Sequence, residues 1–177
     1  MGIFISRLPA QKLGKKQELY EPSDVLMWCG PLVQVEVKIP VELEQELAAK
    51  AAYYPAPVYG VALIDTGATF CHIDYTVVKK LALKPTGIER TQRPATGRKM
   101  VKPAYVTRFS FPRTTLFDFQ SPNVCPYNLS HGGWTLPHGL HGKVVAVLGR
   151  EFLKAYRLTW DGPAGSFSIV DAGGIAS

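Results

Sequence analysis

The 177-residue chain is 46% hydrophobic and 19% charged, a composition that excludes an intrinsically disordered protein. Its length fits one domain that can bury a core of its own. No apolar run approaches the roughly 18 residues of a membrane-spanning helix, and the net charge of +6 permits an acidic partner without requiring one. We therefore expect a globular protein with no membrane partner.

The first thirty residues match no motif, and we expect residues 1–30 to form an N-terminal extension. Met1 to Ser6 has the form of an N-myristoylation pattern, but it also suits an ordinary chain start, which we prefer. We interpret the basic cluster from Lys12 to Lys16 as a solvated tail, and Glu21 to Asp24 as a turn.

The cysteines Cys29, Cys71 and Cys125 are widely spaced and include no Cys-x-x-Cys pair. This spacing gives no support to a zinc site, and three free thiols favour a reducing compartment, so we expect a cytoplasmic location. His72 follows Cys71 directly. Neighbouring residues on a strand point to opposite faces, which disfavours a catalytic Cys–His pair.

Two strands with a helix between them are predicted in the first half of the chain. Apolar and polar side chains alternate from Leu32 to Ile39, which predicts a half-buried strand. Early glutamates and interior alanines predict a helix over Val41–Ala52. The apolar run from Val58 to Ile64 then predicts a strand buried on both faces.

This second strand ends in Asp65-Thr66-Gly67, followed by Ala68 and Thr69. A carboxylate at the end of a buried strand is held in a fixed direction, and Gly67 permits a sharp turn that brings backbone N–H groups towards it. Taken alone, Asp65 is better explained by an Asx turn with its own backbone than by a catalytic role.

A capped helix and a long hairpin are predicted next. Asp74 is a candidate N-cap for a helix from Tyr75 to Leu81. Residues 88–95 and 99–111 predict two extended arms, joined at the tip Ala95-Thr96-Gly97-Arg98. The basic residues of the hairpin suit contact with acidic substrates or nucleic acid, but we prefer solvated charges that prevent edge pairing. The arms carry no interleaved aromatic residues of the kind that stack bases, so no nucleic-acid partner is expected.

Residues 121–143 are rich in Pro, Gly, Asn and His, and they predict a long loop that flanks a substrate cleft. His131, His138 and His141 lie in it, but a metal site would also need a cysteine or carboxylate in fixed geometry. We predict no metal and no cofactor.

Strong strand signals return at Val144–Leu148, a run that predicts a second buried strand. Gly149 follows it, and a short helix is predicted over Arg150–Ala155. Tyr156–Trp160 and Ser166–Val170 predict a terminal hairpin, whose apolar side chains either form a dimer interface or cap the core of their own chain.

The strings from Leu63 to Thr69 and from Val144 to Leu153 resemble, in this order, the motifs of retropepsin-like (retroviral-type) aspartic peptidases. The resemblance covers about residues 32–170. It implies an all-β retropepsin-like acid protease fold with short helices, in which a single domain is half of a two-fold dimer. The predicted divisions are the extension 1–30, the peptidase domain 31–171 and a tail 172–177.

The resemblance also implies roles for individual residues. Asp65, Thr66 and Gly67 would be catalytic, and Gly149 and Arg150 structural. Ala68, Thr69 and the hairpin tip would contact the substrate, with a flap over Arg90–Val106. In many retroviral enzymes an Asp stands at the position of Thr69 and pairs with the arginine, so Asp74 and Asp118 become candidate partners of Arg150. The helix after residue 40 would be an insertion, because the family usually has a short turn there.

Aspartic peptidase chemistry needs one ionised and one protonated carboxylate, about 3 Å apart. The chain contains no second Asp-Thr-Gly or Asp-Ser-Gly, and Asp161-Gly162 lacks the middle residue. A homodimer would supply the second Asp65. The resemblance thus implies an aspartic endopeptidase that acts on peptides or proteins. The alternative is a catalytically weak dimerisation or peptide-binding module.

Overall fold

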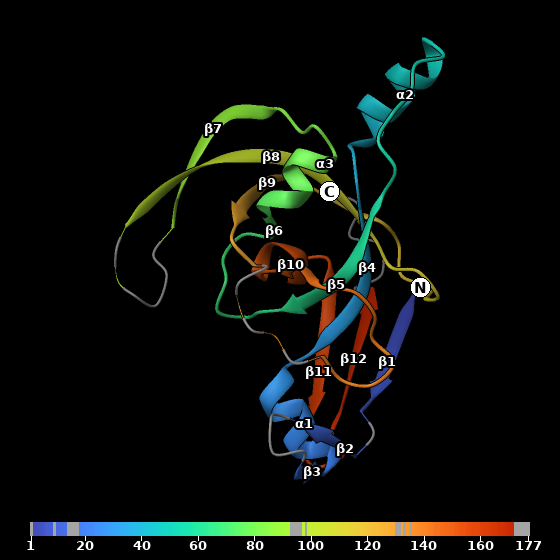
Figure 1. Cartoon of the computed structure of the whole chain (residues 1–177), viewed down its shortest axis with the longest axis vertical. Coiled ribbons are helices and arrows are strands. Elements are labelled where there is room, and N and C mark those ends of the chain that lie inside the picture. Colours follow the sequence, from blue (N-terminus) through green and yellow to red (C-terminus); the bar gives the residue numbers. More distant parts are fainter. Residues whose placement is uncertain are drawn as a thin grey trace.

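The main sheet has seven strands in the order β4-β5-β10-β6-β9-β8-β7, and β4 also pairs with β8. This extra pairing makes the sheet fold back on itself (Figure 1). The computed structural model describes residues 2–8, 10–13, 18–92, 97, 99–129, 132, 134 and 136–171. The strands of this sheet are β4 (Leu32–Lys38), β5 (Val58–Ile64), β6 (His72–Asp74), β7 (Pro85–Gln92), β8 (Met100–Ser110), β9 (Phe119–Tyr127) and β10 (Val144–Leu148).

A second sheet has the order β1-β12-β11, and β2 pairs with β3 in a small separate ribbon. Both pairings of β12 are antiparallel, so the N-terminal strand extends the predicted terminal hairpin by one strand. The bounds are β1 (Ile3–Arg7), β2 (Gln11–Leu13), β3 (Glu18–Tyr20), β11 (Tyr156–Asp161) and β12 (Ser166–Asp171). The predicted boundary between residues 1–30 and 31–171 stays a prediction, although the two parts share this sheet.

The helices are short: α1 (Pro22–Cys29), α2 (Val41–Ala49), α3 (Tyr75–Lys80) and α4 (Arg150–Leu153). The predicted class, all-β with short helices, is confirmed. The predictions of α2, α3, α4, the long hairpin β7–β8 and the terminal hairpin β11–β12 are also confirmed. No helix in the described part of the chain is long and apolar enough to cross a membrane.

Two predictions were wrong. The expected turn at residues 21–24 is the start of α1, where Pro22 occupies the first helical turn and therefore leaves no backbone donor unpaired. The expected loop at residues 121–143 contains most of β9, which pairs with both β8 and β6. Pro122 and Asn123 are turn residues by composition, and the β8–β9 register shifts between Tyr105 and Thr107 opposite them.

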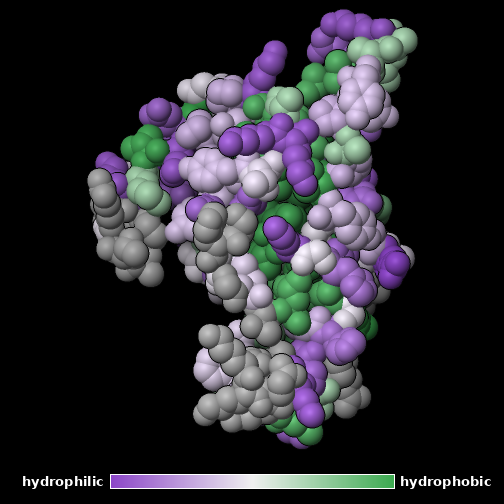
Figure 2. Space-filling view, viewed as in Figure 1, coloured by the Kyte–Doolittle hydropathy of each residue, from purple (hydrophilic) through white to green (hydrophobic). Residues whose placement is uncertain are grey.

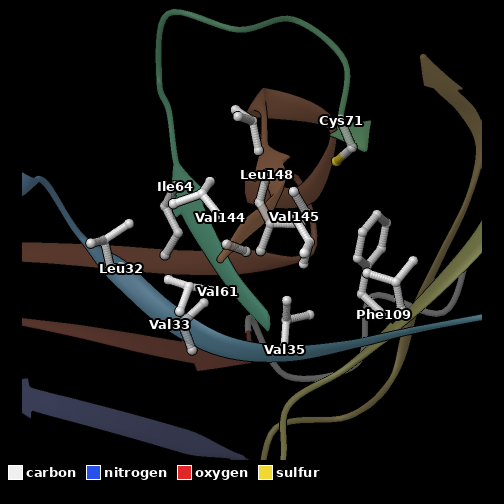
Figure 3. Packing of buried hydrophobic residues seen from close by; sticks show 14 of the residues in the cluster. Leu32, Val33, Val35, Val61, Ile64, Cys71, Phe109, Val144, Val145 and Leu148 are labelled. Atoms are coloured by element: carbon white, nitrogen blue, oxygen red, sulfur yellow. The ribbon is translucent and has the colours of Figure 1, made fainter. Parts of the chain in front are cut away.

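The core lies between the strands of the main sheet and includes both faces of β10 (Figure 3). Val33, Val35 and Val37 are buried on β4, as the alternation predicted. Of the hairpin residues, Phe167 and Ile169 are buried in the core of their own chain, whereas Trp160 is 48% exposed. The capping alternative therefore holds for Phe167 and Ile169, because β12 lies between β1 and β11.

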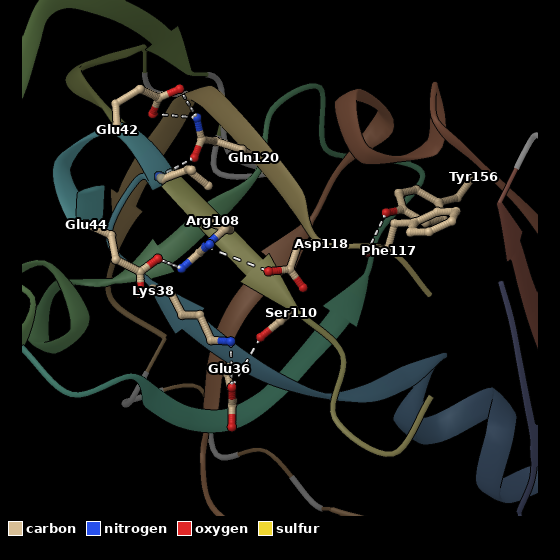
Figure 4. A network of polar contacts seen from close by, with 11 residues as sticks. Glu36, Lys38, Glu42, Glu44, Arg108, Ser110, Phe117, Asp118, Gln120 and Tyr156 are labelled. Carbon is tan, nitrogen blue, oxygen red and sulfur yellow. Dashed lines mark hydrogen bonds and ion pairs between the residues drawn. The ribbon is translucent and has the colours of Figure 1, made fainter. Parts of the chain in front are cut away.

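Polar contacts connect α2 to the sheet (Figure 4). None of the residues of α2 is fully buried, although Leu43 and Leu47 pack partly buried against the core. The guanidinium of Arg108 on β8 donates to Glu44, and the Gln120 side chain both donates to Glu42 and accepts from the backbone N–H of Val41 at 2.9 Å. In the same view Tyr156, which stacks on Phe152, donates to the carbonyl of Phe117.

Candidate active site

Asp65 follows β5 at the point where β5 and β10 end side by side. The two strands are parallel, with Leu148 paired to Ile64. The backbone N–H of Asp65 donates to the carbonyl of Leu148 at 3.0 Å, and that of Ile64 donates to Pro31 at 3.0 Å. Two neighbouring segments therefore fix the backbone that carries the carboxylate.

The carboxylate itself is oriented by its own loop. The backbone N–H of Gly67 donates to Asp65 Oδ1 at 2.7 Å, and that of Ala68 donates to the Asp65 carbonyl at 3.2 Å. The Asx turn considered from the sequence is thus present. Asp65 is half-buried, and among the described residues its Oδ2 has no hydrogen-bond partner. One oxygen is held by the turn and the other is open to a ligand.

Arg150 fastens this loop to α4. Its Nη1 donates to the carbonyls of Thr66 at 2.8 Å and Gly67 at 3.2 Å, and its Nη2 donates to Thr69 Oγ1 at 2.8 Å. The backbone N–H of Arg150 also donates to the carbonyl of Ala68 at 2.8 Å. The arginine therefore bonds to the Asp-Thr-Gly loop directly.

Neither carboxylate considered as a partner for Arg150 contacts it. Asp74 caps α3 by accepting from the Thr76 N–H at 2.8 Å, and its Oδ2 accepts from the Leu129 N–H at 2.8 Å. Asp118 lies 3.8 Å from Arg108 Nε instead. The prediction of Asp74 or Asp118 as the partner of Arg150 was wrong. The Arg150 guanidinium donates instead to the hydroxyl of Thr69 and to the loop carbonyls.

Gly149 stands where two backbone segments meet. A Cβ at this position would lie 2.4 Å from the carbonyl oxygen of Phe70 and 2.8 Å from that of Ala68. Backbone oxygens cannot move aside as a flexible side chain can, so the close contact between the Asp65 loop and α4 requires glycine. The predicted roles of Gly149 and Arg150 stay predictions, and this geometry supports them.

A cavity of about 500 Å³ opens beside Asp65. Gly67, Ala68 and Thr69 line it, as predicted for substrate-contacting residues. Hydrophobic residues gather in the middle of the face that Figure 2 shows, with hydrophilic residues around them. The lining also includes Leu63, Phe70, His72, Gln92, Tyr127 and Val147. Of these, Gln92 lies in the segment predicted as a flap.

The β7–β8 hairpin reaches this cavity through Thr91 and Gln92, near the end of β7. Of the predicted tip, Ala95, Thr96 and Arg98 lie outside the described residues. Gly97 has a φ of 78°, a conformation that favours glycine, and it is not among the lining residues. The role of the tip as a flap stays a prediction.

His72 is the second ionisable side chain of the cavity. Its Nδ1 lies 3.4 Å from Gln92 Nε2, and its ring meets Tyr127 edge-on at 6.0 Å. Burial lowers the pKa of His72, and the nearby charge of Asp65 opposes this shift. The imidazole is therefore held towards its neutral form.

Cys71 is fully buried among the hydrophobic residues of the core (Figure 3) and is not among the residues that line the cavity. Burial raises the pKa of its thiol to about 12, so a thiolate nucleophile does not form there at ordinary pH. No group of three or more His, Cys, Asp or Glu side chains in the described ranges is arranged to hold a metal ion.

A chain of polar contacts connects β7 to α4. Arg90 on β7 donates from Nε to Asn123 Oδ1 at 3.1 Å, and Asn123 Nδ2 donates to Glu151 Oε1 at 3.0 Å. The Arg90 guanidinium also lies over the ring of Phe70, 5.2 Å from its centroid. Since Phe70 lines the cavity, these contacts join the hairpin, the Asp65 loop and α4. No sequence signal indicated this set of contacts, because Asn123 was predicted to lie in a loop.

The structure has the order of elements that the resemblance implied: apolar strand, Asp-Thr-Gly loop, short helix, long hairpin, apolar strand and Gly-Arg helix. No family model and no curated protein matches the chain. Among solved structures, the chain is similar to a retropepsin-like aspartic protease from Rickettsia conorii, with a TM-score of 0.43 and 10% sequence identity. The match covers 94% of this chain and 90% of that chain. A likeness at this level carries no argument about the site, whose chemistry rests on the geometry above.

Proposed function

We propose that the protein is a homodimeric aspartic endopeptidase, in which the Asp65 residues of two chains form the catalytic pair. One observation carries this proposal. Asp65 is fixed at the end of a buried strand, with Oδ1 bonded to the Gly67 N–H at 2.7 Å, beside a cavity of about 500 Å³.

The chemistry requires a second carboxylate. One carboxylate takes a proton from the attacking water, and the other donates a proton to the oxygen of the scissile carbonyl. Among the described residues that line the cavity, Asp65 is the one carboxylate. A two-fold axis close to Asp65 would place a second copy opposite it, and the two would share one proton because neighbouring like charges disfavour double ionisation.

The surroundings of Asp65 suit a peptide substrate. Leu63, Phe70, Tyr127 and Val147 offer apolar surface for a substrate side chain, and Gln92 offers an amide for hydrogen bonds to its backbone. Gln92 comes from β7 and Asp65 from the loop after β5, and both residues line the cavity. A peptide bound between them would be held from two segments.

The competing function is a peptide-binding or dimerisation module with little hydrolysis. An intact Asp65 held in a defined turn favours the peptidase, since a module of that kind needs no carboxylate at this position. A thiol mechanism is disfavoured, because Cys71 is fully buried and burial raises the pKa of its thiol to about 12.

The test is digestion of a denatured peptide library at several pH values, with products identified by mass spectrometry. We expect cleavage by the wild-type protein and none by Asp65→Asn, since asparagine keeps the shape but cannot act as the base. Asp161→Asn, which changes an exposed carboxylate in the terminal hairpin, is the matched control and should remain active. Equal turnover by a correctly folded Asp65→Asn would refute the assignment.

A further inference from the structure

One wall of the cavity is a row of three side chains from neighbouring strands. Val147 on β10 pairs with Leu63 on β5 and with His72 on β6, and all three residues line the cavity. Asp65 stands two positions after Leu63, just past the end of β5. Two strand spacings of about 4.8 Å separate β5 from β6, so His72 lies about 10 Å across the sheet from the strand that leads to the proposed catalytic carboxylate.

The far end of this row is polar, whereas Leu63 and Val147 are aliphatic. Gln92 on β7 places its Nε2 at 3.4 Å from His72 Nδ1, and its amide is also a hydrogen-bond partner of the Cys125 thiol. A primary amide has two donors and two acceptor sites, more than these two contacts use. The hairpin and β6 therefore present hydrogen-bonding groups together at one end of an otherwise apolar wall.

This polar end carries no net charge at neutral pH. Burial lowers the pKa of His72, against the opposing effect of Asp65, and the ring forms no ion pair within the described part of the chain. Arg90 lies over the ring of Phe70 but bonds to Asn123. A charged substrate side chain would therefore lose its water here without gaining an opposite charge. An aliphatic side chain would cover the donors and acceptors of the pair without bonding to them.

A carboxamide meets both conditions, because it is neutral and has donors as well as an acceptor. We propose that His72 and Gln92 form a specificity subsite that selects a carboxamide side chain, such as that of glutamine, in the peptide substrate. Its aliphatic stem packs on Val147 while its amide bonds to the imidazole and to Gln92. An extended peptide advances about 3.3 Å per residue, so the selected residue lies within about three positions of the scissile bond. The inference rests on the proposed peptidase function and names the class of substrate.

The first experiment sorts the bonds that the wild-type protein cleaves in a denatured peptide library by the residues on either side of them. Methionine and glutamate are the matched comparisons for glutamine, because methionine has a similar length without the amide and glutamate has the same shape with a charge. We expect glutamine to be enriched at one position by at least about tenfold over both. Cleavage without this enrichment would overturn the inference and leave the peptidase proposal intact.

The second experiment repeats this digestion with His72→Leu and with Gln92→Met, which replace the two polar groups by apolar ones. We expect both variants to lose the preference for glutamine and to cleave methionine peptides at least as well as the wild type does. His141→Leu, at an exposed position outside the cavity lining, is the control and should keep the preference. A preference for glutamine that survives in both variants would refute the subsite. If His72→Leu does not fold, Gln92→Met decides, because Gln92 is only partly buried.

Peptide binding separates failure of the subsite from failure of the proposed function. Full-length Asp65→Asn is equilibrated with the same library, and the bound peptides are separated by gel filtration and identified by mass spectrometry. If the wild type cleaves nothing, the peptidase proposal fails and binding alone tests the subsite. Enrichment of glutamine peptides on Asp65→Asn, lost in the double variant Asp65→Asn/His72→Leu, would then support the subsite. Bound peptides without glutamine enrichment would overturn it.

Discussion

Arg150 donates to Thr69 through Nη2 at 2.8 Å, and the same guanidinium holds the carbonyls of Thr66 and Gly67. The loop that carries Asp65 is therefore fastened to α4 by neutral acceptors. A planar guanidinium presents several donors at fixed angles, so one side chain can hold three acceptors of one loop at once.

We expect Arg150→Lys to lower kcat/KM by about 10- to 100-fold, a loss typical of misplaced catalytic groups, because a lysine ammonium cannot reproduce the three contacts. The melting temperature should change little, since Arg150 is exposed. Peptide cleavage and thermal unfolding check the two effects. Arg157→Lys, on an exposed position of β11, is the control and should leave both unchanged. Unaltered kcat/KM in Arg150→Lys would show that the loop holds its shape without the arginine.

Gly149→Ala tests the close contact between the loop and α4. The added methyl group would lie 2.4 Å from the Phe70 carbonyl, and we expect a loss of about 3 kcal/mol in unfolding free energy, or failure to fold. Gly162→Ala is the matched control. Its nearest neighbour is Trp160 Nε1 at 3.3 Å, on a side chain that can move, so the expected change is within about 0.5 kcal/mol. Denaturant unfolding measures both, and equal stability of the two variants would contradict the steric account.

Asn123 is expected to hold the β7–β8 hairpin in place, because its side chain bonds to both Arg90 and Glu151. Asn123→Ala leaves both charged groups without this partner, at a cost of about 1–3 kcal/mol. If the hairpin covers the substrate, KM should also rise several-fold, whereas a purely structural role would lower stability alone. Arg90→Lys should reproduce the rise in KM, since it removes the same contact and weakens the stacking on Phe70. KM values equal to wild type in both variants would show that these contacts do not contribute to substrate binding.

His72 is expected to make folding stability depend on pH. Burial lowers its pKa in the folded state below the unfolded value of about 6.5, so protonation favours unfolding. The contribution of the neutral ring is present above about pH 6.5 and is lost as the pH falls through the folded-state pKa. Denaturant midpoints at pH 7.5 and pH 5 should therefore differ less in His72→Gln than in the wild type. His141→Gln, at an exposed position, should behave as the wild type. If the stability of His72→Gln depended on pH as strongly as that of the wild type, groups other than His72 would cause the dependence.

The elements that the sequence predicted correctly are those with a local signal. The alternation in β4 and the apolar runs of β5 and β10 follow directly from which faces are buried. Asp65 was identified because a polar Asp-Thr-Gly stands at the abrupt end of one such run. These signals depend on a few neighbouring residues and do not need the rest of the fold.

The errors lie where pairing between distant segments decides the structure. Pro122, Asn123 and Pro126 carry turn propensity, yet β9 is held in the sheet by β8 on one side and β6 on the other. The acceptors of Arg150 were missed for a related reason: two are backbone carbonyls, which no side-chain pattern indicates. Arg90, Asn123 and Glu151 are far apart in the chain, so only the folded sheet brings them together.

The pH profile of cleavage should reflect the shared proton of the Asp65 pair. Activity should be greatest at mildly acidic pH and decline at alkaline pH, because raising the pH removes the proton that the acid must donate. Chelators should have no effect, since the proposed mechanism uses no metal. A rate that increases steadily to about pH 9 would instead indicate a thiol or metal mechanism. Initial rates on one fixed peptide across a buffer series, with and without chelator, measure both.

Catalysis by a pair of identical chains makes a quantitative prediction for mixtures. When equal amounts of wild-type and Asp65→Asn chains exchange freely, about half of the wild-type chains have a mutant partner, and activity per wild-type chain should fall to about half. Adding Asp161→Asn in place of Asp65→Asn controls for dilution and should cause no such fall. Subunit exchange is measured separately, by mass spectrometry of chains labelled with different isotopes. If exchange is complete and activity stays proportional to the number of wild-type chains, each chain supplies its own catalytic groups, and the shared pair of Asp65 carboxylates is wrong.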